Sequence, residues 1–330
     1  MQYRPLGESG LQAGVVGFGA WAIGGWMWGG ADEADALRAV ETALDLGVNL
    51  IDTAPVYGFG RSEELVGRAI RSRRDQVVLA TKCGLRWDRP DGRLFFRSDQ
   101  DNVRPDGPLQ VRRCLRPDSI AQEIEASLRR LGTDRLDLYQ THWQDDTTPL
   151  EDTLAALHRL RDQGKIRALG VSNVALEHLQ RYGPIASAQQ RYNLLDRAIE
   201  MDGTLAYCRE HKIAVLAYSP LAQGLLTGRL TPDRRFGPGD LRRKNPQFSP
   251  ARRRRVLALL EALAPLARCH GAASSQLIIA WTLAQPGLTH VLCGARRPDQ
   301  VIENARGGDL SLSPADLRRF DDIAARHLPL

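Results

Sequence analysis

The sequence is poor in cysteine, in lysine and in aromatic residues. The few cysteines and lysines limit the kinds of site that the protein can contain. The cysteines are an odd number and no two of them form a Cys-x-x-Cys pair, so we expect neither a disulfide framework nor a zinc ribbon, and predict no metal site. They stand at Cys83, Cys114, Cys208, Cys269 and Cys293. Among the 45 basic residues, only Lys82, Lys165, Lys212 and Lys244 are lysines, so a task that needs an amine has few candidates.

Long apolar runs are also missing. None approaches the length of about 18 residues that a membrane span needs, and the first residues form no apolar core of a signal peptide. The sequence therefore predicts a cytoplasmic protein with no membrane partner. With 43% hydrophobic and 25% charged residues, the composition is typical of a globular protein and excludes disorder. The net charge of +6 fits either a nucleic acid or phosphorylated small molecules, and the charge alone does not decide between them.

Short β-rich runs alternate with longer amphipathic runs along the chain. The expected strands are 15–20, 49–53, 77–83, 136–143, 166–172, 188–192, 215–220 and 290–294. The expected helices between and after them are 34–47, 62–72, 117–132, 149–164, 176–182, 203–212, 274–285 and 298–306. Parallel strands joined by helices need cover on both faces, so this pattern predicts an α/β fold, a closed (β/α)8 barrel forming one domain over residues 1–330.

Four segments lie outside the repeat. Residues 2–6 and 11–15 flank a turn signal and predict a hairpin that plugs the N-terminal mouth of the barrel. Residues 86–116 and 231–250 are long, follow strands, and are therefore expected over the catalytic face as lids. Residues 313–327 predict a final helix.

Two other motifs point to different functions. Gly17-Phe-Gly19-Ala-Trp-Ala22 matches a dinucleotide fingerprint, but that fingerprint needs a helix to open at its glycines, and further glycines follow here. We interpret these glycines instead as a strand end that a ligand approaches closely. The run Arg252 to Arg255 would suit a polyanion, although it lacks interleaved aromatic residues and reads more simply as a solvated helix face.

Polar residues stand at the ends of three neighbouring strands, where a barrel brings side chains to one mouth. Asp52 ends the second strand with Tyr57 close behind it, Lys82 ends the third, and His142 ends the fourth. Taken singly, Asp52 could cap a turn, Tyr57 could pack in a loop and His142 could be a satisfied core histidine. Lys82 is harder to explain in this way, because lysine is rarely buried without a partner.

Together, these four residues suit the delivery of a proton to a carbonyl oxygen while a hydride reaches the carbon. The ordinary pKa of tyrosine is about 10, and a nearby ammonium group is expected to lower it. Lys82 would supply that charge to Tyr57, Asp52 would hold Lys82 in place, and His142 would orient the carbonyl group.

These residues and several later motifs resemble the aldo-keto reductases over nearly the whole chain. The motifs are Gly170-Val-Ser-Asn173, Gln189-x-x-Tyr192, Tyr218 to Arg229 and Gly294 to Asn304. The resemblance implies an NADP(H)-dependent oxidoreductase with Tyr57 as general acid and base. It implies that Ser172, Asn173 and Gln189 hold the carboxamide and that Tyr218 stacks on the nicotinamide. The 2'-phosphate would lie near Arg296, Gln300 and Asn304. The remaining implied cofactor contacts are Gly19, Ala20, Trp21, Asp52, Ser219, Pro220, Leu221, Gln223, Gly224, Arg229, Gly294 and Glu303.

The aromatic residues near the strand ends resemble those of bacterial reductases and sugar or polyol dehydrogenases of the general-stress and inositol-operon type. An aromatic substrate pocket is therefore expected from Trp21, Trp26, Trp28, Phe59 and Trp143. The expected partner is a small carbonyl compound or sugar and not a nucleic acid, and a monomer is the default. A cofactor-binding sensor or regulatory subunit with slow turnover stays the alternative, because a fold does not settle a function.

Overall fold

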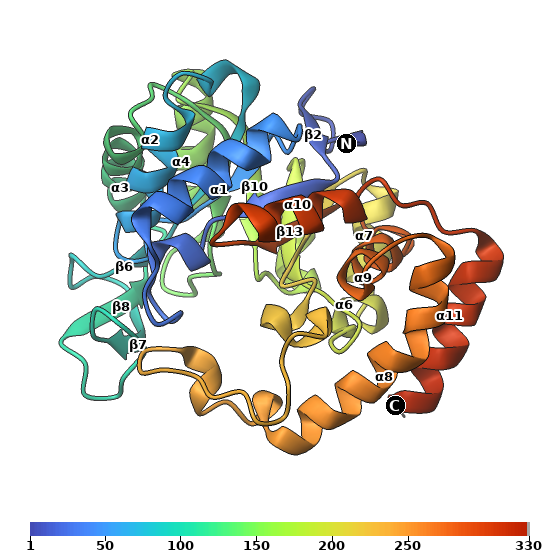
Figure 1. Ribbon diagram of the computed structural model, residues 1–330. Coiled ribbons are helices and arrows are strands. Elements are labelled where there is room, and N and C mark those ends of the chain that lie inside the picture. The colour runs from blue at the N-terminus through green and yellow to red at the C-terminus, as the bar shows by residue number, and fades with distance from the viewer. Residues whose placement is uncertain (329–330) are drawn as a thin grey trace.

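The computed structural model describes residues 1–328, and a closed barrel of eight parallel strands lies at its centre (Figure 1). The order of strands around the barrel is β10-β11-β12-β13-β3-β4-β5-β9. Their bounds are β3 Val16–Gly19, β4 Leu50–Asp52, β5 Val78–Cys83, β9 Leu136–Thr141, β10 Ile166–Ser172, β11 Ser187–Arg191, β12 Ala214–Tyr218 and β13 His290–Gly294. This arrangement confirms the expected (β/α)8 fold class.

Helices connect the strands and surround the barrel (Figure 1). They are α1 Glu33–Asp45, α2 Arg61–Ile70, α3 Pro117–Leu131, α4 Leu150–Asp162, α5 Leu176–Leu179, α6 Ala198–Met201, α7 Thr204–Glu210, α8 Pro250–Cys269, α9 Ser274–Leu283, α10 Pro298–Gly307 and the expected final helix α11 Pro314–His327. The helix expected at 176–182 is shorter, since the chain tightens into turns after Leu179 and Gly183 adopts a φ of 70°. No single helix in residues 1–328 combines the length and the hydropathy of a membrane span. The pair α8 and α9 reaches them only jointly, across a bend of 83°.

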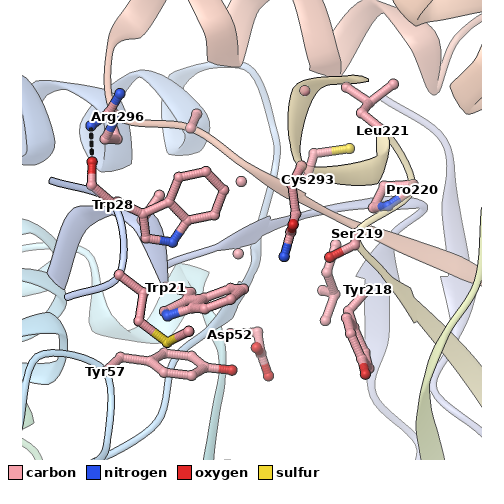
Figure 2. Close-up of a pocket in the computed structure, with 18 of the residues that line it drawn as sticks. Trp21, Trp28, Asp52, Tyr57, Tyr218, Ser219, Pro220, Leu221, Cys293 and Arg296 are labelled. Atoms are coloured by element: carbon pink, nitrogen blue, oxygen red, sulfur yellow. Dashed lines mark hydrogen bonds between the residues drawn. The ribbon is translucent and has the colours of Figure 1, made fainter. Parts of the chain in front are cut away.

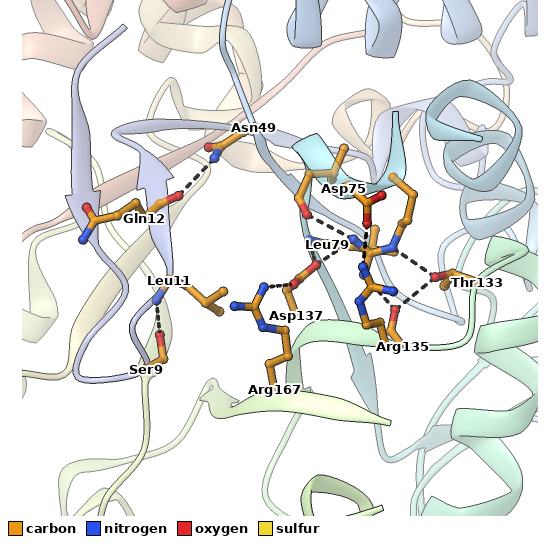
Figure 3. A network of polar contacts seen from close by, with 12 residues as sticks. Ser9, Leu11, Gln12, Asn49, Asp75, Leu79, Thr133, Arg135, Asp137 and Arg167 are labelled. Carbon is orange, nitrogen blue, oxygen red and sulfur yellow. Dashed lines mark hydrogen bonds and ion pairs between the residues drawn. The ribbon is translucent and has the colours of Figure 1, made fainter. Parts of the chain in front are cut away.

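The expected hairpin closes the N-terminal end of the barrel. Strands β1 (Tyr3–Pro5) and β2 (Gln12–Gly14) pair antiparallel, and Leu6 and Leu11 pack in one buried cluster with barrel residues such as Leu50 and Leu138. Asn49 fastens β2 from the barrel side, because its amide donates to the Gln12 carbonyl at 3.0 Å (Figure 3). The prediction of a plug is confirmed.

Inward-facing side chains change character along each strand. Side chains alternate between the two faces of a strand, so the residue two positions after an inward one also points inward. Leu50 is followed in this way by Asp52, and Ala80 is followed by Lys82. In β9, Leu138 is followed by Gln140 and then by His142 just beyond the strand end. Apolar residues therefore fill the lower barrel, and polar residues gather at its carboxyl end.

The two long segments take defined conformations over that carboxyl end. Residues 86–116 contain β7 (Arg93–Ser98) and β8 (Leu109–Arg113), which form an antiparallel sheet with β6 (Leu85–Arg86) in the order β6-β8-β7. Residues 231–250 contain the short 3-10 helices Leu241–Arg243 and Pro246–Phe248. The two segments meet where the Asn102 amide donates to the Gly239 carbonyl at 3.1 Å.

The basic run at the start of α8 divides between surface and interior. Arg253 is buried, and its guanidinium donates to the carbonyls of Thr231 and Arg234 at 2.6 and 2.8 Å. Arg254 and Arg255 are exposed. One member of the run therefore anchors the long segment 231–250, so the run does not form a continuous basic face.

A buried carboxylate ties three strands together near the N-terminal end of the barrel (Figure 3). Asp137 of β9 accepts a hydrogen bond from the Leu79 N–H of β5 at 3.0 Å. It also forms ion pairs with Arg167 of β10 and with Arg74, both at 2.8 Å. The exposed Asp75, which pairs with Arg135 at 2.6 Å, stands at the edge of the same network.

We expect Asp137→Ala to lower the free energy of unfolding by about 2 to 4 kcal/mol, because a buried N–H and two guanidiniums lose their acceptor. The matched change Asp75→Ala should cost less than about 0.5 kcal/mol, since that pair is exposed to solvent. Urea unfolding of both variants measures the difference. Equal stabilities would show that the Asp137 network contributes nothing beyond a surface pair.

Candidate active site

Four residues expected from the sequence meet at the carboxyl end of the barrel. The Lys82 ammonium, which is fully buried, donates to Asp52 Oδ2 at 2.7 Å, to the Thr53 carbonyl at 2.9 Å and to the Tyr57 hydroxyl at 3.2 Å. The rings of Tyr57 and His142 stand edge to face with their centroids 5.7 Å apart. All three protons of the amine thus have acceptors, one of which is the phenol.

The electrostatics of Tyr57 differ from the expectation. Burial raises the pKa of the phenol, the Lys82 ammonium lowers it and the Asp52 carboxylate raises it again. The net pKa lies above the ordinary value, so the prediction of a lowered pKa is wrong in this structure: desolvation outweighs the ammonium. Tyr57 is therefore a protonated donor at neutral pH.

Lys82 and His142 have opposite charge states. Burial by itself lowers the pKa of Lys82, but the charge of Asp52 and the contact with Tyr57 raise it above its ordinary value. Burial and the charge of Lys82 both lower the pKa of His142, to well below its usual range. The site thus holds a charged amine and a neutral imidazole side by side.

Two glutamines complete the surroundings of Asp52. Gln189, which was expected to hold a carboxamide, donates to Asp52 Oδ1 at 2.8 Å. Gln140 donates to the same oxygen at 3.2 Å and is fully buried. The sequence reasoning missed Gln140, although its position two residues before His142 on one strand placed it on the inward face.

A cavity of about 730 Å³ opens above these residues (Figure 2). Trp21, Trp26, Trp28 and Trp143 line it, as expected. Phe59 does not. It packs behind the wall against Trp26 and Trp87, with ring centroids 5.5 and 5.4 Å away. The wall also includes apolar residues that the sequence reasoning missed, namely Met27, Val56, Leu85, Phe95, Phe96 and Val103.

The other end of the cavity has a floor of bare backbone. Gly19 of β3 and Gly294 of β13 face each other in register, and a Cβ at either position would meet only backbone atoms beyond 3.6 Å, so it would enter the cavity. Trp21 and Asp52 line the cavity beside them, whereas Ala20 is fully buried and lies outside the lining. The expected close approach of a ligand fits this glycine pair.

Residues expected around a nicotinamide form a chain of hydrogen bonds. The Tyr218 hydroxyl donates to Asn173 Oδ1 at 2.8 Å, and the Asn173 amide donates to Ser172 Oγ at 3.0 Å. Beyond Tyr218, the wall turns sharply, with positive φ at Ser219 and Gln223. The expected residues of this turn that line the cavity are Ser219, Pro220, Leu221, Gln223 and Gly224.

Guanidinium groups gather at this second end. Arg229 pairs with Glu303, Arg242 with Asp240 and Arg297 with Asp299. Two further arginines of the lining, Arg234 and Arg296, form no ion pair with a carboxylate of residues 1–328. The cluster thus leaves two positive charges without a carboxylate partner, which suits a phosphate dianion.

The start of α10 lies beside these arginines. The Gln300 side chain accepts from the Arg296 backbone N–H at 2.8 Å, so it ties the residue before the helix to the first helical turn. Asn304 is buried and lines the cavity. A helix N-terminus with nearby guanidiniums favours an anion.

A barrel with a buried Asp52-Lys82-Tyr57 contact at the ends of its strands is the arrangement that the resemblance implied for an oxidoreductase. A family model described as the Aldo/keto reductase family matches residues 15–325. The chain belongs to the aldo/keto reductase family, which confirms the resemblance, the enzyme class and the NAD(P)H type of cofactor. In residues 1–328, no group of three or more His, Cys, Asp or Glu side chains could hold a metal ion.

Similar proteins cover nearly the same length. Aldo-keto reductase YhdN of Bacillus subtilis is 41% identical over 91% of this chain and 87% of its own. NADH-specific methylglyoxal reductase of Escherichia coli is 40% identical over 98% of both chains. The structure of glycerol dehydrogenase AKR11B4 from Gluconobacter oxydans has a TM-score of 0.86 at 40% identity, over 99% of this chain and 96% of that one. An aldo/keto reductase from Klebsiella pneumoniae in complex with NADP and acetate has a TM-score of 0.72 at 29% identity, over 98% and 96%.

We expect the His142 imidazole to stay neutral between about pH 8 and 5.5, because an unperturbed histidine would titrate near 6.5 and burial beside Lys82 opposes protonation. The NMR chemical shifts of its ring C–H protons should stay constant over that range. These signals are assigned by their absence from the spectrum of His142→Gln. A titration midpoint near the unperturbed value would contradict the buried, neutral state.

Proposed function

We propose that the protein catalyses reversible hydride transfer between NADPH and the carbonyl group of an aldehyde, ketone or sugar. Tyr57 acts as general acid in reduction and as general base in oxidation. The observation that supports this role is the fully buried Lys82 ammonium, which contacts both Asp52 and the Tyr57 hydroxyl. A charged amine held against a phenol in an apolar site is a means of stabilising the phenolate.

The proton path follows from this contact. When bound, the reduced cofactor supplies the hydride. Tyr57 gives its hydroxyl proton to the carbonyl oxygen, and Lys82, already 3.2 Å from the phenol oxygen, stabilises the phenolate that forms. In oxidation, Tyr57 takes the proton back. The raised pKa of Tyr57 suits the acid role, since the proton stays on the phenol until a carbonyl oxygen accepts it.

His142 and Asp52 support this transfer in different ways. A neutral His142 can donate a ring N–H to the carbonyl oxygen without competing with Lys82 as a positive charge. Asp52 fixes the ammonium from the far side, and Gln140 and Gln189 in turn fix Asp52. The network orients the amine toward Tyr57.

The residues of the second cavity end fit a dinucleotide with a 2'-phosphate. The glycine floor leaves room for a close ligand, and Arg234 and Arg296 form no ion pair with a carboxylate of residues 1–328. Ser172, Asn173, Gln189 and Tyr218 would hold the nicotinamide end, and Gln300, Glu303 and Asn304 the adenosine end. Because one relative is named NADH-specific and one similar structure contains NADP, the choice of cofactor needs a test on this chain.

The substrate end favours a carbonyl compound with apolar surface. Its walls are indole and phenyl rings, and Trp26 is fixed by a hydrogen bond from its N–H to Ser98 at 3.0 Å. A regulatory subunit could bind the cofactor in the same cavity. It would not need the contact between Asp52, Lys82 and Tyr57, so this contact favours the enzyme. Cytoplasmic location and a monomeric state stay predictions.

We expect Tyr57→Phe to lower kcat by about 10²-fold to 10⁴-fold, the usual contribution of a general acid, with the Kd for NADPH changed less than threefold. Loss of NADPH absorbance with a panel of aldehydes, ketones and aldoses gives the turnover, and fluorescence titration gives the Kd. Tyr207→Phe, a change on the outer helix α7, serves as the control. Undiminished turnover in Tyr57→Phe would refute the mechanism, and NADPH binding without turnover on any substrate by the unaltered protein would favour the regulatory subunit.

We expect Arg296→Ala to weaken NADPH binding by about 10-fold to 100-fold, in line with the loss of a charge-assisted contact. NADH binding should change less than threefold, because NADH has no 2'-phosphate. The matched control is Arg306→Ala, which removes an exposed guanidinium from the far end of α10. An equal loss for both cofactors would show that Arg296 does not read the phosphate.

A further inference from the structure

Arg296 contacts the aromatic wall as well as the cofactor end of the cavity. Its Nη1 group donates to the backbone carbonyl of Trp28 at 3.1 Å (Figure 2). The same group donates to the Gly30 carbonyl, also at 3.1 Å. A residue expected to meet a phosphate thus holds a segment from the opposite end of the chain. The remaining N–H groups of the guanidinium are available to a second acceptor, since arginine has five donors.

Residues 26–30 depend on contacts with other parts of the chain. They lie outside the helices and strands, and φ is positive at Met27, Gly29 and Gly30. The Met27 N–H donates to the Asp101 carbonyl at 2.7 Å, and the Met27 carbonyl accepts from Leu241 N–H at 2.9 Å. The segment is therefore held by both long segments and by Arg296.

The position of the Trp28 ring follows that of its backbone. Within residues 1–328, the buried N–H groups of Trp28 and Trp21 have no hydrogen-bond partner. The rings contact other side chains only through their faces and edges: Trp28 meets Trp21 edge to face at 5.3 Å, and Trp21 stacks on Tyr57 at 6.1 Å between centroids. A shift of the Trp28 carbonyl would therefore move the wall beside the candidate general acid.

Arg296 lies near other arginines and one carboxylate. Burial lowers the pKa of its guanidinium first, the neighbouring charge of Arg242 lowers it further, and the charge of Asp240 raises it. Arg242 itself lies over the Trp28 ring, 5.1 Å from its centroid. An anion at the free edge of Arg296 would add to the partial balance of charge that Asp240 provides.

We propose that Arg296 is a positioning residue for the substrate pocket, which couples the cofactor's 2'-phosphate to the Trp28 wall. This inference rests on the proposed function. The phosphate binds the free edge of the guanidinium while Nη1 keeps the Trp28 and Gly30 carbonyls, so that NADPH orders the wall and NADH does not. Coupling of this kind is reciprocal: a substrate that packs on the wall also strengthens binding of the phosphate.

A binding experiment tests the coupling without turnover. The probe is 2',5'-ADP, which has the phosphate but no nicotinamide, and 5'-AMP is the matched control ligand. We expect 2',5'-ADP to change the tryptophan fluorescence of the protein by an amount that Trp28→Phe removes, and 5'-AMP to give no such change. Calorimetry verifies that 2',5'-ADP binds both proteins. Binding of 2',5'-ADP with the same fluorescence response in both would overturn the proposal.

A kinetic experiment tests it during catalysis. The KM for benzaldehyde is measured with NADPH and with NADH, each saturating, so that cofactor affinity no longer enters. We expect a KM at least threefold lower with NADPH, with kcat changed less than twofold. The ratio of the two KM values should fall to one in Arg296→Ala and stay unchanged in Arg306→Ala. A ratio of one in the unaltered protein, or a ratio that survives Arg296→Ala, would overturn the coupling.

The two experiments separate this inference from the proposed function. Turnover with NADPH, but equal KM values and no Trp28 signal, would leave the reductase standing and remove the coupling. A Trp28 signal from 2',5'-ADP without turnover on any carbonyl substrate would support the coupling and remove the reductase. Failure of 2',5'-ADP to bind at millimolar concentration would overturn the coupling, because its phosphate site would be absent.

Discussion

The structure depends on one buried charge. Lys82 has no exposed surface, and an ammonium in such a place is costly unless it is paired and fully hydrogen-bonded. Asp52 provides the pairing, and Gln140 and Gln189 in turn satisfy the second oxygen of Asp52. Since these residues come from four different strands, the barrel must close in one register for the charge to be tolerated. The Tyr57 hydroxyl accepts the remaining hydrogen bond of the amine. The proposed general acid therefore also stabilises the buried charge.

The need to pair this buried charge is met by the barrel strands, whereas much of the cavity wall comes from other segments. The strands supply apolar layers below and polar ends above, because side chains alternate along each strand. Much of the wall comes from segments outside the repeat: Phe95 and Phe96 from β7, Trp28 from residues 26–30 and Phe236 from residues 231–250. The buried charge and its strand partners therefore belong to the barrel, whereas much of the aromatic wall belongs to added segments, one of which Arg296 contacts through the Trp28 carbonyl.

Periodicity and end signals predicted the barrel, its plug and the convergence of Asp52, Tyr57, Lys82 and His142, since these follow from local pattern and from the geometry of parallel strands. They could not predict contacts that depend on distant partners. Phe59 looked like a wall residue but packs behind Trp26, and Arg253 looked solvated but holds two loop carbonyls. The raised pKa of Tyr57 was missed for the same reason: the charge of Lys82 is visible in a sequence, whereas the depth of burial that outweighs it is not.

The hairpin at the N-terminus determines at which end of the barrel a ligand can enter. Leu6 and Leu11 fill the lower mouth of the barrel together with the inward side chains of the strands. The cavity lies at the other end of the barrel, where residues of both long segments, such as Phe96 and Phe236, contribute to its lining. In the proposed function, cofactor and substrate would therefore both enter and leave at the carboxyl end of the barrel.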